Sequence, residues 1–130
     1  MSAPVRAPHQ SESVAQICLF RWAAFMQGRF PELELMYHVP NEGKRSVSAG
    51  ARMKREGLKP GVPDICLPVP HSGFHGLYVE MKVGSNTPTD NQKKWLAALK
   101  KQGYATAVCY GWEAASKVIL QYLGGTGNEE

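Results

Sequence analysis

The sequence predicts an α/β fold in which helices flank a mixed sheet of four strands. Within residues 59–83, two apolar runs lie on either side of a turn rich in proline, glycine and histidine, which is typical of a β-hairpin. Residues 104–110 form another apolar run, as expected of a central or parallel strand. Helical patterns alternate with these strands, in the order helix, strand, short helix, strand, strand, helix, strand, helix.

The chain of 130 residues is long enough for one domain with a single hydrophobic core. We expect a disordered arm over residues 1–10, the domain over residues 11–123 and a tail over residues 124–130. No apolar run is long enough to span a bilayer, and the polar N-terminal segment does not resemble a signal peptide. The three cysteines lie in apolar segments without a pairing pattern, which predicts reduced core thiols in a cytoplasmic protein that has no membrane partner.

The first helix is expected to begin after Ser11, whose hydroxyl can cap a helix N-terminus, and to continue to about Gln27. Glu12 follows this cap, at a position where the helix dipole favours a negative charge. After a break, residues 33–39 are expected to form the first strand, which ends near His38. This histidine is a candidate for contact with a substrate, although a hydrogen-bonded position in the core is the more common role.

A turn is expected at residues 40–43, because asparagine and glycine tolerate left-handed backbone conformations. The next segment predicts a short basic helix that is capped by Ser46 or Ser48 and ends at Gly57.

The hairpin is expected to bring three charged groups together. Its strands are residues 64–69 and residues 77–83, and side chains in the second strand alternate strictly between apolar and polar. Glu80 and Lys82 therefore share one face, because successive side chains of a strand point to opposite sides. Folding about the central turn places Asp64 opposite the region of Glu80 and Lys82.

Two neighbouring carboxylates and an amine suggest phosphoryl chemistry. Asp64 and Glu80 would repel each other, and a divalent cation relieves that repulsion; oxygen ligands suit Mg²⁺, for which Mn²⁺ can substitute. Lys82 can position a water molecule or stabilise the charge that develops on a phosphoryl oxygen. The alternative is a structural salt bridge on a half-exposed sheet.

The third helix is expected to use Thr87 as its N-cap and Pro88 as its first residue, and to run to about Gln102. The last helix is expected over residues 112–123.

Gln92 lies on the stripe of the third helix that should pack inward, together with Trp95 and Leu99. An amide on an apolar stripe needs a hydrogen-bond partner, which makes Gln92 a candidate neighbour of the charged groups. The alternative is a boundary residue whose amide lies in water.

Residues 40–60 contain six lysines and arginines but only two glutamates, so their net charge of +4 equals that of the whole chain. A basic segment beside a cluster of carboxylates predicts contact with a polyanionic substrate, although a solvated loop and helix face is the usual alternative. The candidate nucleic-acid-binding residues are Lys44, Arg45, Arg52, Lys54, Arg55 and Lys59.

Four ordered motifs resemble the VRR-Nuc branch of the PD-(D/E)xK nucleases. They are PNEGKR at residues 40–45, GLKPGVPD at residues 57–64, EMK at residues 80–82, and Gln92 with Trp95 at the opening of a helix. EMK alone is a weak signal, but the ordered set is more specific. The resemblance extends from about residue 12 to residue 123 and implies a restriction-endonuclease-like core.

The resemblance also implies a site and a reaction. Asp64, Glu80, Lys82 and Gln92 would be catalytic, and a Mg²⁺ ion would be bound by Asp64, Glu80, Glu12 and the carbonyl of Met81. Hydrolysis of DNA would give 5′-phosphate and 3′-hydroxyl ends.

Small stand-alone members of this kind, from phage and bacteria, point to branched DNA as the substrate, especially four-way (Holliday) junctions. Two symmetric cuts in such a junction favour a homodimer, acting in the cytoplasm of a bacterial or phage-infected host cell. Apolar residues in excess of one core face could form the dimer contact, and the candidates are Trp22, Met26, Trp112 and Tyr122.

The alternatives are a non-catalytic nucleic-acid-binding module on the same fold, a restriction-type nuclease and a flap nuclease. A structural zinc protein is disfavoured, because Cys66, His71 and His75 have no fourth ligand nearby in the sequence. There is also no glycine-rich phosphate loop and no nucleophile elbow.

Overall fold

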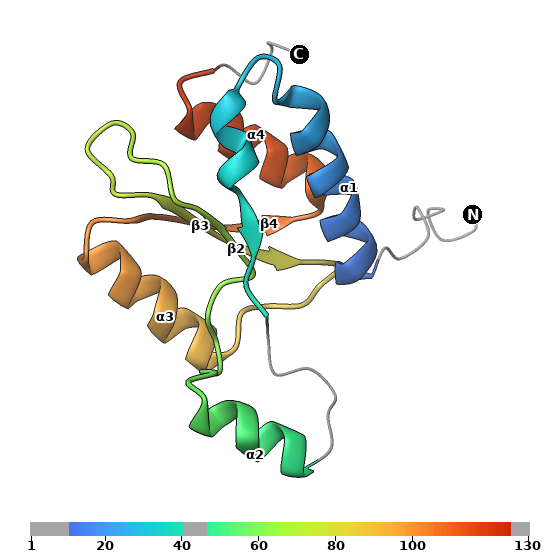
Figure 1. Ribbon diagram of the computed structural model, residues 1–130, viewed down its shortest axis with the longest axis vertical. Coiled ribbons are helices and arrows are strands. Elements are labelled where there is room, and N and C mark those ends of the chain that lie inside the picture. Colours follow the sequence, from blue (N-terminus) through green and yellow to red (C-terminus); the bar gives the residue numbers. More distant parts are fainter. Residues whose placement is uncertain (1–10, 41–46, 126–130) are drawn as a thin grey trace.

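A computed structural model describes residues 11–40 and 47–125 (Figure 1). The elements are α1 (Glu12–Met26), the 3₁₀ helix η1 (Pro31–Leu35), β1 (Tyr37–His38), α2 (Val47–Arg55), β2 (Ile65–Leu67), β3 (Leu77–Lys82), α3 (Asp90–Lys101), β4 (Ala105–Tyr110) and α4 (Trp112–Tyr122). The expectations for residues 1–10, 41–46 and 126–130, which include Lys44 and Arg45, lie outside the described residues.

The four strands form one mixed sheet in the order β1-β2-β3-β4. β2 is antiparallel to both β1 and β3, whereas β4 is parallel to β3 and lies at the edge. In Figure 1, α1 and α4 cover one face of this sheet, and α3 lies on the other. The predicted α/β class and mixed four-stranded sheet are therefore confirmed. The sequence predicted that β4 is central or parallel, and the structure shows a parallel edge strand.

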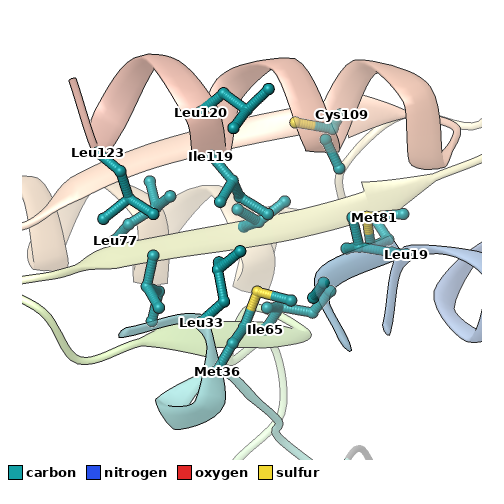
Figure 2. Packing of buried hydrophobic residues seen from close by; sticks show 14 of the residues in the cluster. Leu19, Leu33, Met36, Ile65, Leu77, Met81, Cys109, Ile119, Leu120 and Leu123 are labelled. Atoms are coloured by element: carbon teal, nitrogen blue, oxygen red, sulfur yellow. The ribbon is translucent and has the colours of Figure 1, made fainter. Parts of the chain in front are cut away.

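The hydrophobic core lies between the sheet and the pair α1 and α4. Leu77, Val79 and Met81 of β3 are all buried and point toward this core, as the alternation in the sequence predicted. They pack in one cluster with Leu19 of α1 and Ile119 of α4, neither of which is exposed (Figure 2). Burial of these apolar side chains from β3, α1 and α4 stabilises β3 as the central element of the fold.

The strand expected over residues 33–39 is wrong in its first half. Residues Pro31–Leu35 form η1 instead, and only Tyr37 and His38 pair with β2. Leu33 and Met36 are both buried. Their spacing of three residues places them on the same side of a 3₁₀ helix, which has three residues per turn, whereas it would place them on opposite faces of a strand.

The N-cap of α3 is Thr89, not Thr87. The Thr89 hydroxyl accepts a hydrogen bond of 3.2 Å from the backbone N–H of Gln92, and the Gln92 side-chain oxygen accepts one of 2.8 Å from the Thr89 N–H. This reciprocal capping box satisfies two N–H groups at the start of the helix. Pro88 consequently precedes the helix rather than opening it.

The hairpin turn uses two residues with positive φ, Ser72 (50°) and Gly73 (85°). His71 and Phe74 exchange both backbone hydrogen bonds across it, which is the pattern of a type I′ turn. β2 is shorter than the expected residues 64–69, because Pro68 has no N–H to continue the ladder.

The basic helix α2 contains no buried residue and lies apart from the sheet on the side of α3 (Figure 1). It is followed by Gly57, whose φ of 107° ends the helix as expected. No helix in the described ranges is both long and apolar enough to cross a membrane.

Candidate active site

Asp64 and Glu80 face each other across the hairpin. The register pairs Ile65 with Val79. Asp64, which directly precedes Ile65, therefore lies opposite Glu80, which directly follows Val79. Asp64 Oδ2 accepts a hydrogen bond of 2.8 Å from the backbone N–H of Met81, which fixes the carboxylate beside β3. Both acidic side chains are buried, Asp64 with 7% and Glu80 with 1% of its surface exposed, so the juxtaposition expected from the hairpin is present.

Glu80 is held in an environment that disfavours its negative charge. Burial is the largest effect, followed by the negative charge of the Asp64 carboxylate, and together they raise the Glu80 pKa to about 8. Lys82 acts in the opposite direction, whereas the more distant Glu12 adds to the increase. The metal-free site therefore favours a protonated Glu80 at neutral pH.

The two oxygens of Glu80 differ in their surroundings. Oε2 accepts a hydrogen bond of 3.1 Å from Gln92 Nε2 and lies 3.9 Å from Lys82 Nζ. Oε1 is buried and has no hydrogen-bond partner. A buried oxygen without a partner is unfavourable, and a bound cation would satisfy it.

Gln92 is oriented by the capping box of α3. Its side-chain oxygen is occupied by the Thr89 N–H, so its amide nitrogen is the end that faces Glu80. The prediction that Gln92 points inward did not include this second contact with the Thr89 N–H. The Thr-x-x-Gln spacing in the sequence is a signal for that contact and also identifies Thr89 as the cap.

Glu12 is the first residue of α1, directly after the N-cap Ser11. It is half-buried, and its charge raises the pKa of Glu80. Across the residues that the structure describes, however, no three His, Cys, Asp or Glu side chains form a group that could hold one metal ion. Direct metal ligation by Glu12, and by the carbonyl of Met81, stays a prediction.

His38 and Tyr110 border the site. The exposed His38 is not a core histidine; its Nδ1 lies 3.1 Å from the backbone oxygen of Asp64. Tyr110 pairs in register with Lys82, is half-exposed and donates a hydrogen bond of 2.7 Å to the carbonyl of Asn86. The sequence did not single out Tyr110, because only the parallel register of β4 places it beside Lys82.

The loop between α2 and β2 is fixed to the start of α3. Gly61 has a φ of 90°, and a Cβ at this position would lie 2.6 Å from the backbone carbon of Asn91. Only glycine fits both this conformation and this close approach. The loop that carries Lys59 is thereby positioned beside the helix that carries Gln92.

The basic residues of α2 are accessible to a large ligand. Arg52 forms an exposed ion pair of 3.5 Å with Glu56, and Arg55 and Lys59 are also exposed. By contrast, the side chains considered for zinc do not assemble. Cys66 is buried within β2, and the ring of His75 packs at 5.7 Å against that of Tyr104.

The four-stranded sheet, its flanking helices and the hairpin with Asp64, Glu80 and Lys82 define an α/β protein with a restriction-endonuclease-like fold. The family model for the VRR-NUC domain matches residues 10–113, and the chain belongs to this nuclease-type family. A solved structure described as "VRR_NUC domain protein" is 28% identical in sequence, with a TM-score of 0.76 over 94% of this chain and 98% of that chain. No curated protein matches the sequence.

Proposed function

We propose that the protein is a Mg²⁺-dependent endonuclease that hydrolyses phosphodiester bonds in branched DNA, with four-way junctions as its preferred substrate. The observation that supports this most strongly is the buried pair of Asp64 and Glu80 beside Lys82. Two buried carboxylates repel each other, which destabilises the folded protein unless they bind a charged ligand.

The residues present fit a divalent cation. Asp64 and Glu80 offer hard oxygen ligands, and Glu80 Oε1 lacks any other partner. Glu12 and the Met81 carbonyl would complete the ligand set, and Mn²⁺ would substitute for Mg²⁺. When bound, the ion supplies Lewis-acid stabilisation of charge on the reacting phosphate and lowers the pKa of coordinated water.

The protein side chains would supply positioning and charge. Lys82 Nζ orients the attacking water and offsets negative charge on the phosphoryl oxygens. Gln92 holds the Glu80 carboxylate in place through the hydrogen bond to Oε2. Cleavage of the bond between phosphorus and the 3′ oxygen leaves a 5′-phosphate and a 3′-hydroxyl.

DNA binding would use the basic segment around α2. Arg52, Lys54 and Arg55 lie on this helix, and Lys59 follows it. Lys44 and Arg45, which precede α2 in the sequence, would add two positive charges to the binding segment. Lysine and arginine contacts to phosphates are independent of base sequence, which suits recognition of DNA structure rather than of a sequence motif.

A homodimer would provide the two cuts that a four-way junction requires, since the described part of the chain holds one buried carboxylate pair, Asp64 and Glu80. An apolar groove between α1 and α4 is lined in part by Trp22, Phe25 and Trp112. Phe25 has 86% of its surface exposed, which is unusual for a side chain of this size. Of the other two candidates, Met26 also lines the groove but is buried, and the Tyr122 hydroxyl donates to the carbonyl of Val69.

Cleavage of a panel of labelled DNAs tests the proposal. Linear duplex, flap, splayed-arm and four-way substrates are incubated with Mg²⁺ or with EDTA. We expect paired symmetric cuts in the four-way junction in Mg²⁺ only. Preferential cutting of the flap would indicate a flap nuclease, and cutting of linear duplex at one sequence would indicate a restriction-type enzyme. Binding without cleavage in either Mg²⁺ or Mn²⁺ would indicate the non-catalytic module.

A further inference from the structure

Helix α3 carries four exposed lysines that have no role in the site described above. They lie in two adjacent pairs, and we call them the lysine stripe: Lys93, Lys94, Lys100 and Lys101. In the described part of the chain, none of the four forms an ion pair. The only acidic residue of the helix is Asp90 in its first turn. Beyond its first turn, the charged side chains on the outer surface of α3 are therefore all positive.

Helix geometry places the two pairs on one side. Lys93 and Lys100 are seven residues apart, which is almost two full turns, and the same holds for Lys94 and Lys101. The pairs are separated by roughly 10 Å along the helix axis. Ala97 lies between them and is exposed. Its short side chain leaves the lysines as the outermost groups, so that an extended polyanion could contact both pairs at once.

The stripe has a fixed position relative to the candidate active site. Gln92, the residue immediately before Lys93, donates its amide hydrogen bond to Glu80. The first lysine pair therefore lies at the end of α3 that is nearer the carboxylates, and the second pair is farther away along α3. In Figure 1, α3 lies on the same side of the sheet as α2, and Gly61 ties the loop after α2 to Asn91. The two basic helices thus lie on the same side of the sheet and are joined through this loop.

We propose that the lysine stripe of α3 is a second DNA-binding surface, which holds the phosphate backbone of a duplex arm leading away from the cleavage site. This inference rests on the proposed nuclease function and adds a contact to it. The ligand chemistry follows from the charges: four unpaired ammonium groups in a row of this length complement a regularly spaced phosphate backbone. Lysine is depleted in protein–protein interfaces relative to the rest of the surface, so a protein partner fits this stripe less well than a nucleic acid does.

The salt dependence of DNA binding tests the proposal. Affinity for an uncut four-way junction and for linear duplex is measured in EDTA by fluorescence anisotropy over a range of KCl concentrations. The variants are Lys93→Gln with Lys94→Gln, and Lys100→Gln with Lys101→Gln. The matched control is Arg21→Gln with Arg29→Gln, which removes two exposed charges from α1 and the residues after it. Cleavage in Mg²⁺ is measured in parallel for every variant.

Each lost phosphate contact lowers the magnitude of the negative slope of log K against log [salt] by about 0.9 for duplex DNA. We expect each stripe variant to lower this magnitude by about 1 to 2, and the control to leave it unchanged. An unchanged slope in both stripe variants, with normal cleavage by the wild-type protein, would overturn the lysine stripe and leave the nuclease proposal intact. A lowered slope without any cleavage by the wild-type protein would overturn the nuclease and retain the stripe. Equal losses in the control would show a general effect of net charge and would also overturn the proposal.

Discussion

The side chain of Gln92 connects the N-cap of α3 to the carboxylate of Glu80. Its oxygen accepts from Thr89 at 2.8 Å, and its nitrogen donates to Glu80 Oε2 at 3.1 Å. One side chain therefore both stabilises the start of a helix and orients a buried acidic group. The two roles can be separated by mutation.

Gln92→Glu keeps the capping box, because glutamate also accepts from the N-cap N–H. It replaces the donor to Glu80 with another carboxylate, so we expect a cleavage rate lower by roughly 10-fold or more with little change in melting temperature. Thr89→Ala should do the reverse, with a loss of about 1 kcal/mol in stability and a smaller effect on the rate. Thermal melts and single-turnover rates of both variants measure this. Parallel losses of stability and rate in both would contradict separate roles.

The stability of the metal-free protein should depend on the protonation of Glu80. Its pKa is raised from 4.5 to about 8 in the folded state, mainly by burial. Between these values the folded protein binds more protons than the unfolded chain, so the free energy of unfolding decreases as the pH rises from 4.5 toward 8. Below 4.5, Glu80 is protonated in both states and contributes no further change.

Glu80→Gln removes this titration. In EDTA, we expect urea unfolding of the wild-type protein to weaken between about pH 5 and pH 8 more steeply than that of the variant. At pH 8, Mg²⁺ should raise the melting temperature of the wild-type protein and not that of Glu80→Gln. Identical pH profiles for the two proteins would mean that folding does not raise the pKa of Glu80.

Lys82 should affect the rate more than the binding of metal. An ammonium group cannot ligate a cation, so Lys82→Ala should retain Mn²⁺ binding in calorimetry while cleavage slows. Lys82→Arg should restore activity only in part, because the guanidinium differs from the ammonium in shape and hydration. Complete loss of Mn²⁺ binding by a folded Lys82→Ala protein would show that Lys82 supports the metal site itself.

The groove between α1 and α4 should be the dimer contact. Phe25 is exposed and lines it, so Phe25→Asp should give a folded monomer. Val47→Asp is a suitable control, because Val47 is equally exposed but lies on α2. Light scattering coupled to size exclusion distinguishes these masses. A monomeric wild-type protein that cuts both strands of a junction would exclude the dimer, and a dimeric Phe25→Asp protein would place the contact elsewhere.

The features of the site that the sequence predicted are those encoded by local patterns. Strict alternation in residues 77–83 specified the face of Glu80 and Lys82, and the hairpin then placed Asp64 opposite them. Alternation usually indicates one solvated face, whereas here α3 covers the polar face, so the deep burial of Glu80 was not predictable from β3 alone. Its burial depends on how a later helix packs.

Two features were predicted wrongly from the sequence: η1, which was expected as a strand, and the N-cap of α3. Leu33 and Met36 have the spacing of a 3₁₀ turn, but a short apolar segment is equally compatible with a strand. Thr87 and Thr89 both have side chains that can cap α3. Only Thr89 has a glutamine three residues later, which completes a capping box. For α3 the deciding signal is the local Thr-x-x-Gln spacing, whereas for η1 only the packing of Leu33 and Met36 into the core decides between the two elements.

Cleavage of a four-way junction by Asp64→Asn tests the central claim most directly. The substitution keeps the size of the side chain and an acceptor for the N–H of Met81, but removes the charge that a cation requires. In Mg²⁺ we expect cleavage at least on the order of 100-fold slower than wild type, with unchanged melting in EDTA at low pH and unchanged affinity for the junction. Cleavage by a folded Asp64→Asn protein at the wild-type rate would show that the Asp64 and Glu80 pair is not the catalytic site.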